Sequence, residues 1–544
     1  MSHYCIARLS RALFLTVSST IWCSAAAVQV ETSFGDLIGH VATVSDGHRC
    51  EEFLGIPFAE KTPRFTSPVP WQTSYPPRGL VASKYATWCP QVDGMSVSGD
   101  EDCLFLNVWR PHETSAGDNL AVMVWIYGGG FNAGDAGDTV SPNTYNGCGL
   151  SARHNVIVAG MNYRIGVLGF TALPNPSGGV AANWGLEDQR EALRWLQREA
   201  SRFGGDSKKM TIFGESAGAQ SVWYHLASRR SAGLFHAAIS ESGFPSGTSS
   251  KYRLNQTFAF AELVGCRRND SAGLRACFTS KSAEELVRAA ASIGGDPEEL
   301  WGPTIDGTDL VDYPDVLFRQ NRTLAVPILT GINTNEGTSF LYPAYPEGMN
   351  ASQYRHFLTD ALVGGDRGLT AQEIAKVLLK YPANSSQDMR PVASALFTDL
   401  FLCRDLNALD HLSTQVRTFV YRFDHRPTCP RPSFAPGAYH GMEMPYVFGT
   451  PKTYDCSFTD EEEALSERMQ LMWTNFAKHL NPSIPGEPFP EYLNPSRRGL
   501  VLRAPTDSTD NGYRASFCKV WDEIWESWGE IRELKKQHAA PIVV

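Results

Sequence analysis

The chain contains short apolar segments separated by longer amphipathic segments, and this alternation restricts the fold more than any other feature of the sequence. The apolar segments are continuous rather than alternating, which is typical of strands in a parallel sheet covered on both faces. Between them, Gly185 to Ala200 has apolar residues at helical spacing. Six strands are predicted, at 120–127, 155–163, 210–213, 235–239, 326–330 and 418–423. Strand and helix alternate throughout, which predicts an α/β fold with a large, mostly parallel central sheet and helices on both faces.

The 544 residues contain no Pro-rich or Ser-rich linker that would divide the chain into autonomous domains. At about 150 residues per domain the length alone would suggest several units, but large α/β sheets often exceed that average. Residues 250–320 and 340–400 are predicted to be long, mostly helical insertions. We therefore expect a single α/β domain over residues 28–544, preceded by a leader.

Residues 1–27 have the features of a secretory signal peptide. Arg8 and Arg11 precede an apolar stretch at 12–23, and small residues follow at 24–27. The apolar stretch is too short to span ~30 Å of hydrocarbon, which disfavours a signal anchor. No later segment reaches 18 apolar residues. We expect cleavage after Ala27 and a secreted, extracellular protein with no membrane span.

The composition excludes several classes of protein. Hydrophobic residues make up 42% of the chain and aromatic residues 11%, which is enough for a large core, so a mostly disordered chain is excluded. The formal net charge of −10 gives the protein no general attraction to nucleic acid or to anionic lipid. A nucleic-acid partner is therefore not expected.

Ten of the twelve cysteines remain after removal of the leader, which contains Cys5 and Cys23. An even number of cysteines in an exported protein favours disulfides, and their spacing matches no CxxC metal-binding pair, so no metal site is predicted. Asn-x-Ser/Thr sequons are confined to one region of the chain, which indicates a solvent-facing segment. The candidate glycosylation sites are Asn255, Asn269, Asn321, Asn350 and Asn384.

Gly214-Glu215-Ser216-Ala217-Gly218 directly follows a predicted strand and precedes a helix-like segment. This is the G-x-S-x-G pattern in the strand–turn–helix context that a nucleophilic serine requires. Ser216 would lie on a sharp turn, where side chains two residues before and after it would collide, and glycine removes them. The following helix would direct its N-terminus toward an oxyanion that forms at this serine.

A second glycine-rich segment, Gly128-Gly129-Gly130, follows the predicted strand at 120–127. Three consecutive glycines cost conformational entropy, and an ordinary turn needs only one or two. A loop whose N–H groups must approach a substrate carbonyl does need them. We therefore predict an oxyanion hole formed by the N–H groups of Gly129, Gly130 and Ala217.

The acid and the base that would accompany Ser216 have more than one candidate. In this architecture the triad order is serine, acid, histidine. Glu336, after the strand at 326–330, and Asp306, in an earlier loop, are the candidate acids. His425, after the strand at 418–423, and His440 are the candidate bases, and spacing does not separate them.

Several longer blocks of sequence then resemble those of a known family. They include FLGIPFA at 53–59, EDCLFLNVW at 101–109, WIYGGGF at 125–131, NYRIGVLGF at 162–170, GLEDQREALRW at 185–195, FGESAG at 213–218, NEGTSF at 335–340 and HGMEMPYVFG at 440–449. In content and order, they resemble the type-B carboxylesterases, the cholinesterase-like and lipase-like members of the α/β-hydrolase fold. The resemblance extends from about residue 53 to the C-terminal region, nearly the whole mature chain.

The resemblance implies an answer to both open choices. The family acid falls on Glu336 and the family base on His440, so that Ser216, Glu336 and His440 would cleave carboxylic esters through an acyl-enzyme, with no cofactor. Family disulfides fall on Cys89–Cys103 and Cys266–Cys277, and a third on Cys403–Cys518. Cys50–Cys148 and Cys429–Cys456 would be additional pairs. Core ion pairs of the family fall on Arg64–Glu101 and Arg164–Asp188.

The substrate class within the family is narrowed by the segment between the first two family cysteines. Acetylcholinesterase-like members carry a tryptophan there that binds quaternary ammonium, but Pro90 to Asp102 contains no aromatic residue. A small-molecule ester other than a choline ester is therefore expected as the substrate. Glu215, Trp223 and Trp301 are candidate substrate-binding residues, although each has an alternative interpretation as a buried residue of the core. A lipase, a cholinesterase and a non-catalytic neuroligin-like adhesion protein are the competing hypotheses.

Overall fold

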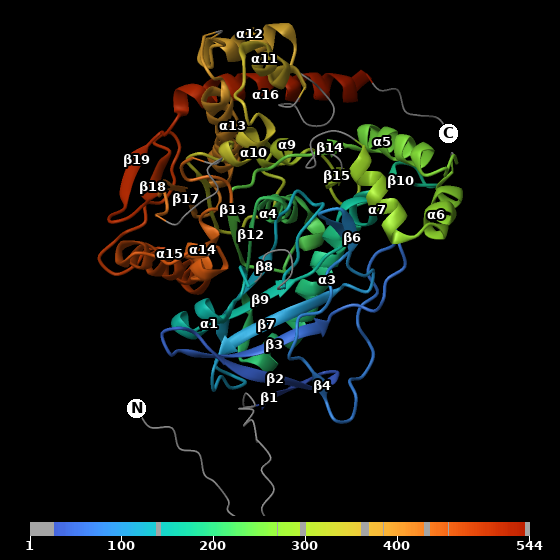
Figure 1. Cartoon of the computed structure of the whole chain (residues 1–544), viewed down its shortest axis with the longest axis vertical. Helices are drawn as coiled ribbons and strands as arrows, with labels where there is room; N and C mark the ends of the chain where they lie inside the picture. Colours follow the sequence, from blue (N-terminus) through green and yellow to red (C-terminus); the bar gives the residue numbers. More distant parts are fainter. Residues whose placement is uncertain are drawn as a thin grey trace, which may run out of the picture.

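The computed structural model describes residues 27–137, 143–268, 270–293, 301–360, 369–384, 386–428, 436–454 and 456–538. Within these residues, thirteen strands form one mixed sheet (Figure 1). They are β1 (Ala27–Thr32), β2 (Gly35–Thr43), β3 (Arg49–Pro57), β4 (Leu80–Val81), β7 (Phe105–Pro111), β8 (Leu120–Ile126), β9 (Ile157–Met161), β12 (Gly205–Glu215), β13 (Ala237–Glu241), β16 (Ile328–Asn333), β17 (Thr418–Phe423), β18 (Arg498–Leu502) and β19 (Ser508–Asn511).

The six predicted strands are confirmed, and they form the continuous centre of the sheet. The order is β9–β8–β12–β13–β16–β17, and every neighbouring pair in it is parallel. β7, β3, β2 and β1 extend this centre beyond β9, and each is antiparallel to its neighbour. Three short pairs lie outside the sheet: β5 (Gln91–Asp93) with β6 (Ser96–Ser98), β10 (Leu173–Pro174) with β11 (Val180–Ala181), and β14 (Thr248–Ser249) with β15 (Thr304–Ile305). The predicted α/β fold is therefore confirmed.

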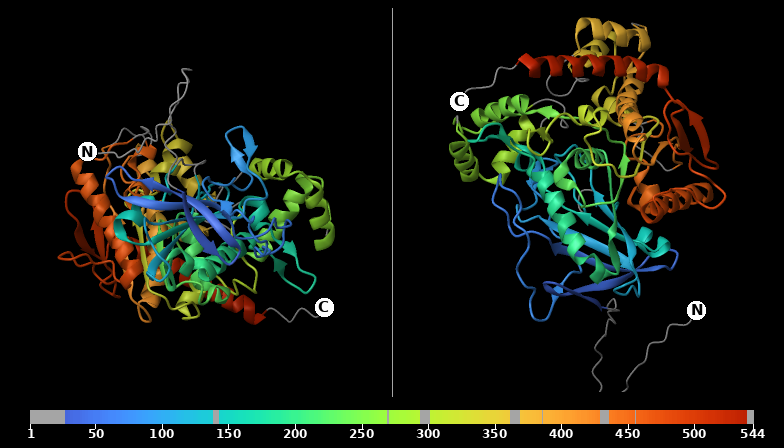
Figure 2. Two further views of the ribbon diagram at one scale, coloured as in Figure 1. Left: turned by 90° about the horizontal axis from the view of Figure 1, so that it is seen from below. Right: turned by 180° about the vertical axis from the view of Figure 1, so that it is seen from behind.

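Helices cover the sheet and build the predicted insertions (Figure 2). The predicted helix at 185–200 is α3 (Trp184–Glu199). The remaining helices are α1 (Cys148–His154), α2 (Gly166–Phe170), α4 (Ala217–Ala227), α5 (Ser250–Leu263), α6 (Ser271–Ser280), α7 (Ala283–Ser292), α9 (Pro314–Arg319), α10 (Thr338–Ala344), α11 (Ala351–Asp360), α12 (Ala371–Lys380), α13 (Arg390–Leu412), α14 (Met444–Phe448), α15 (Asp460–His479) and α16 (Ala515–His538). One group, α4, α9 and α13, packs together near the centre of the sheet, and a second group, α1, α14 and α15, contacts β7, β8 and β12.

None of the helices in the described ranges is long and apolar enough to cross a membrane.

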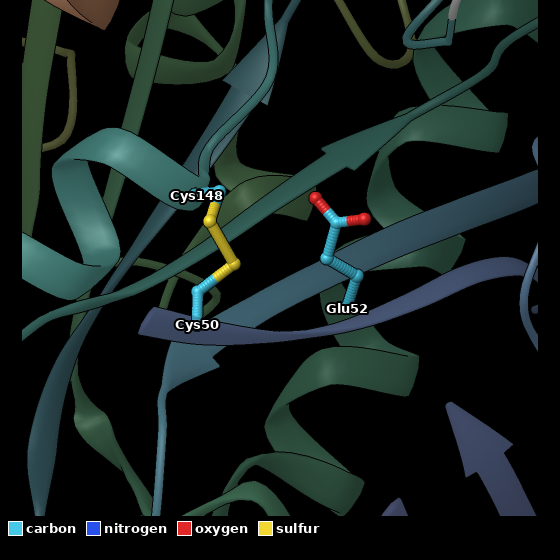
Figure 3. A group of neighbouring side chains, drawn as sticks. All are labelled: Cys50, Glu52 and Cys148. Atoms are coloured by element: carbon cyan, nitrogen blue, oxygen red, sulfur yellow. A yellow bond between two sulfur atoms is a disulfide. The ribbon is translucent and has the colours of Figure 1, made fainter. Parts of the chain in front are cut away.

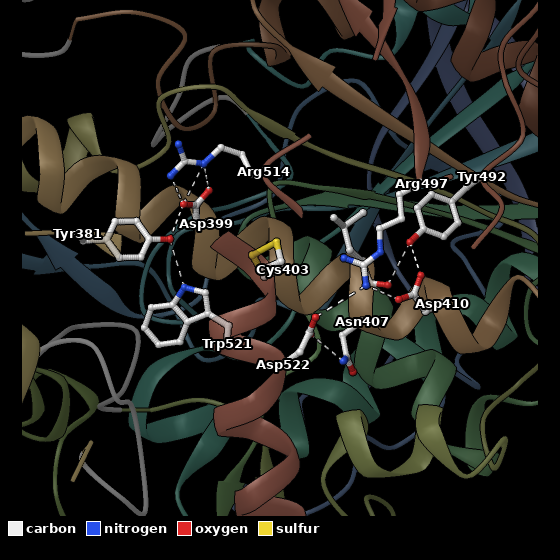
Figure 4. The surroundings of a disulfide bond; sticks show 12 residues. Tyr381, Asp399, Cys403, Asn407, Asp410, Tyr492, Arg497, Arg514, Trp521 and Asp522 are labelled. Carbon is white, nitrogen blue, oxygen red and sulfur yellow. Dashed lines mark hydrogen bonds and ion pairs between the residues drawn. A yellow bond between two sulfur atoms is a disulfide. The ribbon is translucent and has the colours of Figure 1, made fainter. Parts of the chain in front are cut away.

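Four predicted disulfides are present: Cys50–Cys148, Cys89–Cys103, Cys266–Cys277 and Cys403–Cys518. Cys403–Cys518 joins α13 to α16 between two polar clusters, one centred on Asp399 and the other on Asp410 (Figure 4). The predicted Cys429–Cys456 pair involves Cys429, which lies outside the described residues. Both predicted ion pairs are also present, with two short N–O contacts each between Arg64 and Glu101 and between Arg164 and Asp188.

Cys50, Cys148 and Glu52 are the one group of three potential metal-ligand side chains that come together in the described part of the chain (Figure 3). The two sulfur atoms are bonded to each other. Glu52 accepts a hydrogen bond from the Trp109 indole and lies 3.0 Å from His40 Nε2. The group is therefore a disulfide bond next to a carboxylate that has hydrogen-bonding partners of its own.

Loss of the Cys50–Cys148 bridge should cost more stability than loss of a short-range bridge. It closes a separation of 98 residues, whereas Cys266–Cys277 closes 11. Replacing Cys50 and Cys148 with serine is expected to lower the free energy of unfolding by about 2–4 kcal/mol, because the longer loop gains more entropy in the unfolded chain. Denaturant unfolding of this variant and of the Cys266/Cys277 double serine variant measures the difference. A larger loss for the Cys266/Cys277 variant would contradict the prediction.

Candidate active site

Ser216 lies between the end of β12 and the first residue of α4, as the G-x-S-x-G pattern predicts. Its φ is 55° and its ψ is −123°, a backbone conformation that residues with a side chain rarely adopt. The Ser216 N–H donates a hydrogen bond of 2.9 Å to the carbonyl of Glu241, on neighbouring β13. Strain of this kind persists only where the surrounding structure enforces it, and such positions concentrate at functional sites.

The glycines on either side of Ser216 are required by packing. A Cβ at Gly218 would lie 1.9 Å from the Ile126 carbonyl oxygen, and a Cβ at Gly214 would lie 2.6 Å from the carbonyl carbon of Gly218. Real side chains do not approach backbone atoms so closely. The structure therefore supports the predicted reason for both glycines.

The glycine loop after β8 lies directly against the nucleophile. A Cβ at Gly128 would lie 2.8 Å from Glu215 Oε2 and 2.9 Å from Ser216 Cβ. Gly129 and Gly130 have φ angles of 100° and 59°, which favour glycine. Ala217 is the first residue of α4, where N–H groups have no partner inside the helix. The three predicted oxyanion donors thus belong to segments that meet at Ser216.

The structure brings Glu336 and His440 together across 104 residues of sequence. Glu336 Oε2 lies 2.7 Å from Nδ1 of His440, and the Glu336 side chain is completely buried. Glu336 follows β16, whereas His440 lies in the loop between β17 and α14. A carboxylate bound to one imidazole nitrogen fixes the tautomer and leaves the other nitrogen for proton transfer.

The alternative acid and base have other partners. Asp306 accepts hydrogen bonds from the N–H groups of Thr308, Asp309 and Leu310, so it stabilises a turn. His425 lies 3.0 Å from Glu462, in the first turn of α15. Both arrangements organise local structure.

Glu215, beside the nucleophile, is buried and faces the second nitrogen of His440. Its Oε1 lies 3.2 Å from His440 Nε2, a distance at which a protonated imidazole would form an ion pair. Burial raises the pKa of Glu215 to about 7, the His440 charge opposes that rise, and the Glu336 charge adds to it. Glu215 therefore changes charge near neutral pH, next to the atom that would receive the serine proton.

Three further buried carboxyl groups, which the sequence pattern did not predict, lie near the Glu336–His440 pair. Burial raises the pKa of Glu443 to about 8, and repulsion from Glu215 and Glu336 adds to the effect. Burial also raises the pKa of Glu241 and of Asp405 well above the ordinary range. An acidic residue at the end of an apolar strand, as Glu241 is, was the available signal in the sequence.

The buried Glu241 should contribute to stability in acid and lose that contribution as pH rises. Its raised pKa means that folding favours the neutral carboxyl, so stability is lost as pH rises above about 4.3, the ordinary glutamate value. Replacing Glu241 with glutamine removes this loss. At pH 8 we expect the variant to be about 1 kcal/mol or more harder to unfold than the wild type, with a smaller gain at pH 5.

The measurement is denaturant unfolding at both pH values. The same replacement at Glu463, an exposed residue of α15, is the control, and a change within about 0.5 kcal/mol is expected there. A Glu241→Gln variant that loses as much stability between pH 5 and pH 8 as the wild type would contradict the prediction.

The two candidate tryptophans lie in the core. Trp223, on α4, packs edge-on against Phe318, and Trp301 packs edge-on against Phe260. Both side chains are buried. This placement favours their alternative interpretation as core residues.

Comparison with known proteins identifies the family of the chain. The family model described as the carboxylesterase family matches residues 26–521. The chain belongs to the carboxylesterase family. It is therefore a carboxylic ester hydrolase, and the enzyme class predicted from the sequence is confirmed.

The alignments with relatives cover most of this chain and most of each relative. An acetylcholinesterase of Bungarus fasciatus is 33% identical over 545 residues, covering 91% of this chain and 86% of the relative. A cholinesterase of Mus musculus is 32% identical over 532 residues, covering 90% and 86%. An acetylcholinesterase of Electrophorus electricus is 31% identical over 566 residues, covering 91% and 88%.

Proposed function

We propose that this protein is a secreted serine carboxylesterase in which Ser216 is the nucleophile, His440 the general base and Glu336 the acid that orients His440. The observation that carries the proposal is the 2.7 Å contact between Glu336 Oε2 and His440 Nδ1, in a protein whose serine occupies a strained turn. Nucleophile, base and orienting acid follow the chain order typical of this fold.

The proposed reaction gives each of these residues a step. His440 accepts the hydroxyl proton of Ser216 while the serine oxygen attacks the ester carbonyl, and the carbonyl oxygen becomes an oxyanion. The N–H groups of Gly129, Gly130 and Ala217 stabilise that oxyanion, and each such donor contributes roughly 3 kcal/mol in comparable sites. His440 then protonates the leaving alcohol, and the acyl group stays on Ser216. Water, activated by His440, then hydrolyses the acyl-enzyme and releases the carboxylic acid product.

Glu215 supports the charge that His440 gains during this cycle. While its carboxylate is ionised, it lies 3.2 Å from the nitrogen that becomes protonated. Because its pKa is raised to about 7, this support weakens as pH falls below neutral. A role in substrate binding, also considered from the sequence, would involve the same carboxylate.

The proposal is tested by covalent labelling. A fluorophosphonate probe forms a stable adduct with an activated serine, and mass spectrometry of the digested protein locates it. We expect the adduct on Ser216 and none in Ser216→Ala. A burst of p-nitrophenol from p-nitrophenyl acetate, equal to the enzyme concentration, would report the acyl-enzyme. A wild type that is neither labelled nor active on any ester would overturn the proposal and favour the adhesion-protein hypothesis.

A cholinesterase is the second candidate, and the names of the three relatives favour it. Against it, Pro90 to Asp102 contains no aromatic side chain, and the structure forms this segment into the β5–β6 hairpin. A cation–π contact is worth about 2 kcal/mol when desolvated, so its loss would weaken choline binding. We expect higher kcat/KM for p-nitrophenyl butyrate than for butyrylthiocholine. The reverse order would establish a cholinesterase, and activity confined to emulsions of long-chain esters would establish a lipase.

Secretion and glycosylation are also proposed. Asn255, Asn321, Asn350 and Asn384 are exposed, and Asn269 lies outside the described residues. Expression in cultured animal cells should place the protein in the medium, and removal of N-glycans should increase its mobility on a gel. Retention of all the protein inside the cells would contradict the predicted signal peptide.

A further inference from the structure

Asn333 is a buried residue that the proposed mechanism does not use. It is the last residue of β16 and lies three residues before Glu336. Its side chain is completely buried at the end of the sheet where Glu336 and His440 meet. A buried amide is costly unless its polar atoms are paired. Among the described residues Oδ1 of Asn333 has no hydrogen-bond partner, so the contacts of the backbone N–H and of Nδ2 indicate what the residue does.

Asn333 contacts Glu336 and the residue directly before His440. Its backbone N–H donates a hydrogen bond of 2.7 Å to Glu336 Oε1, the carboxylate oxygen that does not face the histidine. Its side-chain Nδ2 donates a hydrogen bond of 2.8 Å to the carbonyl of Tyr439, the residue directly before His440. One residue therefore holds the acid and the loop that carries the base.

The second proton of the same amide is directed at another buried group. Asn333 Nδ2 also donates to Glu443 Oε2, and Glu443 Oε1 lies 3.3 Å from the Ser242 hydroxyl. Asn333 thus links β16 to both sides of His440, at residues 439 and 443.

The chemistry of these contacts explains why the residue is an asparagine. A short side chain must donate two hydrogen bonds, one to a carbonyl and one to a carboxyl group, and the –NH₂ group of asparagine does this. Aspartate has the same size but would direct an oxygen at both acceptors. Serine would supply only one donor.

We propose that Asn333 is a positioning residue, which sets the distance and orientation between Glu336 and His440 by tying both loops to β16. The proposal rests on the proposed function, in which this pair activates Ser216. The loop containing Tyr439 and His440 has a second attachment, since Asn335 N–H donates to the Ala438 carbonyl. Removal of the Asn333 amide should therefore misplace the histidine without unfolding the loop.

The test compares Asn333→Asp and Asn333→Ser with Asn107→Asp. Asn107, on β7, is a matched control, because it is a buried amide that joins two segments by donating to Ala136 O and accepting from Gly55 N–H. The assay is kcat and KM for p-nitrophenyl acetate across pH. For Asn333→Asp we expect kcat to fall about 10-fold to 100-fold, with KM changed less than about threefold, because misplacement of the reacting groups affects the transition state.

Two readouts separate positioning from a general loss of structure. In Asn333→Ser, which adds no charge, the acid limb of the kcat/KM profile should move to lower pH by about half a unit, because Glu336 stabilises the imidazolium of a displaced His440 less. The far-downfield proton resonance of the His440 Nδ1–H should weaken or shift in both Asn333 variants but not in Asn107→Asp. Asn333→Ser, which retains one donor, should fall between wild type and Asn333→Asp, and it provides the test if the aspartate variant does not fold.

The inference is overturned if the Asn333 variants match Asn107→Asp within about twofold in kcat and keep the wild-type acid limb and downfield resonance. Failure of the proposed function would look different. In that case wild type itself would show no labelling at Ser216 and no hydrolysis above Ser216→Ala.

Discussion

Replacing His440 with glutamine is expected to lower kcat for ester hydrolysis by about five orders of magnitude, because loss of the base removes the activation of the serine. Glutamine has a similar length but does not accept and return a proton at neutral pH. His440 is the histidine that the structure places against the buried Glu336. The measurement is single-turnover and steady-state hydrolysis of p-nitrophenyl acetate by both proteins.

His425→Gln is the matched control for this prediction. His425 pairs with Glu462 and accepts a weak hydrogen bond from the N–H of Ala504, contacts that hold α15 and a neighbouring loop. We expect a lower unfolding midpoint and a kcat within about threefold of the wild type. A large loss of kcat in a folded His425→Gln, with activity retained in His440→Gln, would reverse the assignment of the base.

Glu336→Gln is expected to lower kcat by about 10⁴-fold, the magnitude seen when the orienting acid of a serine hydrolase becomes an amide. The amide keeps the size of the side chain but presents an N–H or a neutral oxygen to His440 Nδ1, so the imidazole adopts the wrong tautomer and loses electrostatic support. KM should change little, because the defect is confined to the transition state.

Asp306→Asn tests the other candidate for the acid and is compared with Glu336→Gln. Asp306 accepts three backbone N–H groups in a turn, so its replacement should reduce stability and leave kcat within about threefold of the wild type. Circular dichroism and a thermal unfolding curve of each variant show that losses of activity come from folded protein. Equal losses of kcat in the two variants would mean that Glu336 has no special role.

Both predictions depend on a site assembled from distant parts of the chain. Ser216 is at the end of β12, Glu336 follows β16 and His440 follows β17, and these strands belong to the parallel centre of the sheet. Parallel strands direct their carboxyl ends to the same edge, which is where ligands bind in open α/β sheets. The fold thereby converts a separation of 104 residues between Glu336 and His440 into a contact of 2.7 Å.

The sequence by itself predicted whatever depends on local pattern. Continuous apolar segments predicted the central strands, because a strand buried on both faces needs apolar residues at every position. Gly214 and Gly218 predicted the sharp turn at Ser216, since backbone atoms occupy the space of a side chain there. The resemblance of longer sequence blocks to the family added predictions of the cysteine pairs and of the two ion pairs. The described residues confirm all of these pairs except Cys429–Cys456.

Only the tertiary structure decided which distant side chains meet. Residue spacing left His425 and His440 as equal candidates, and the structure gives one of them Glu462 and the other Glu336. It also buries Glu241 and Glu443 near the site and directs the Asn333 amide at the histidine loop. The physical reason is that a pKa or a hydrogen bond depends on neighbours in space. Those neighbours come from strands and loops that the local sequence does not place.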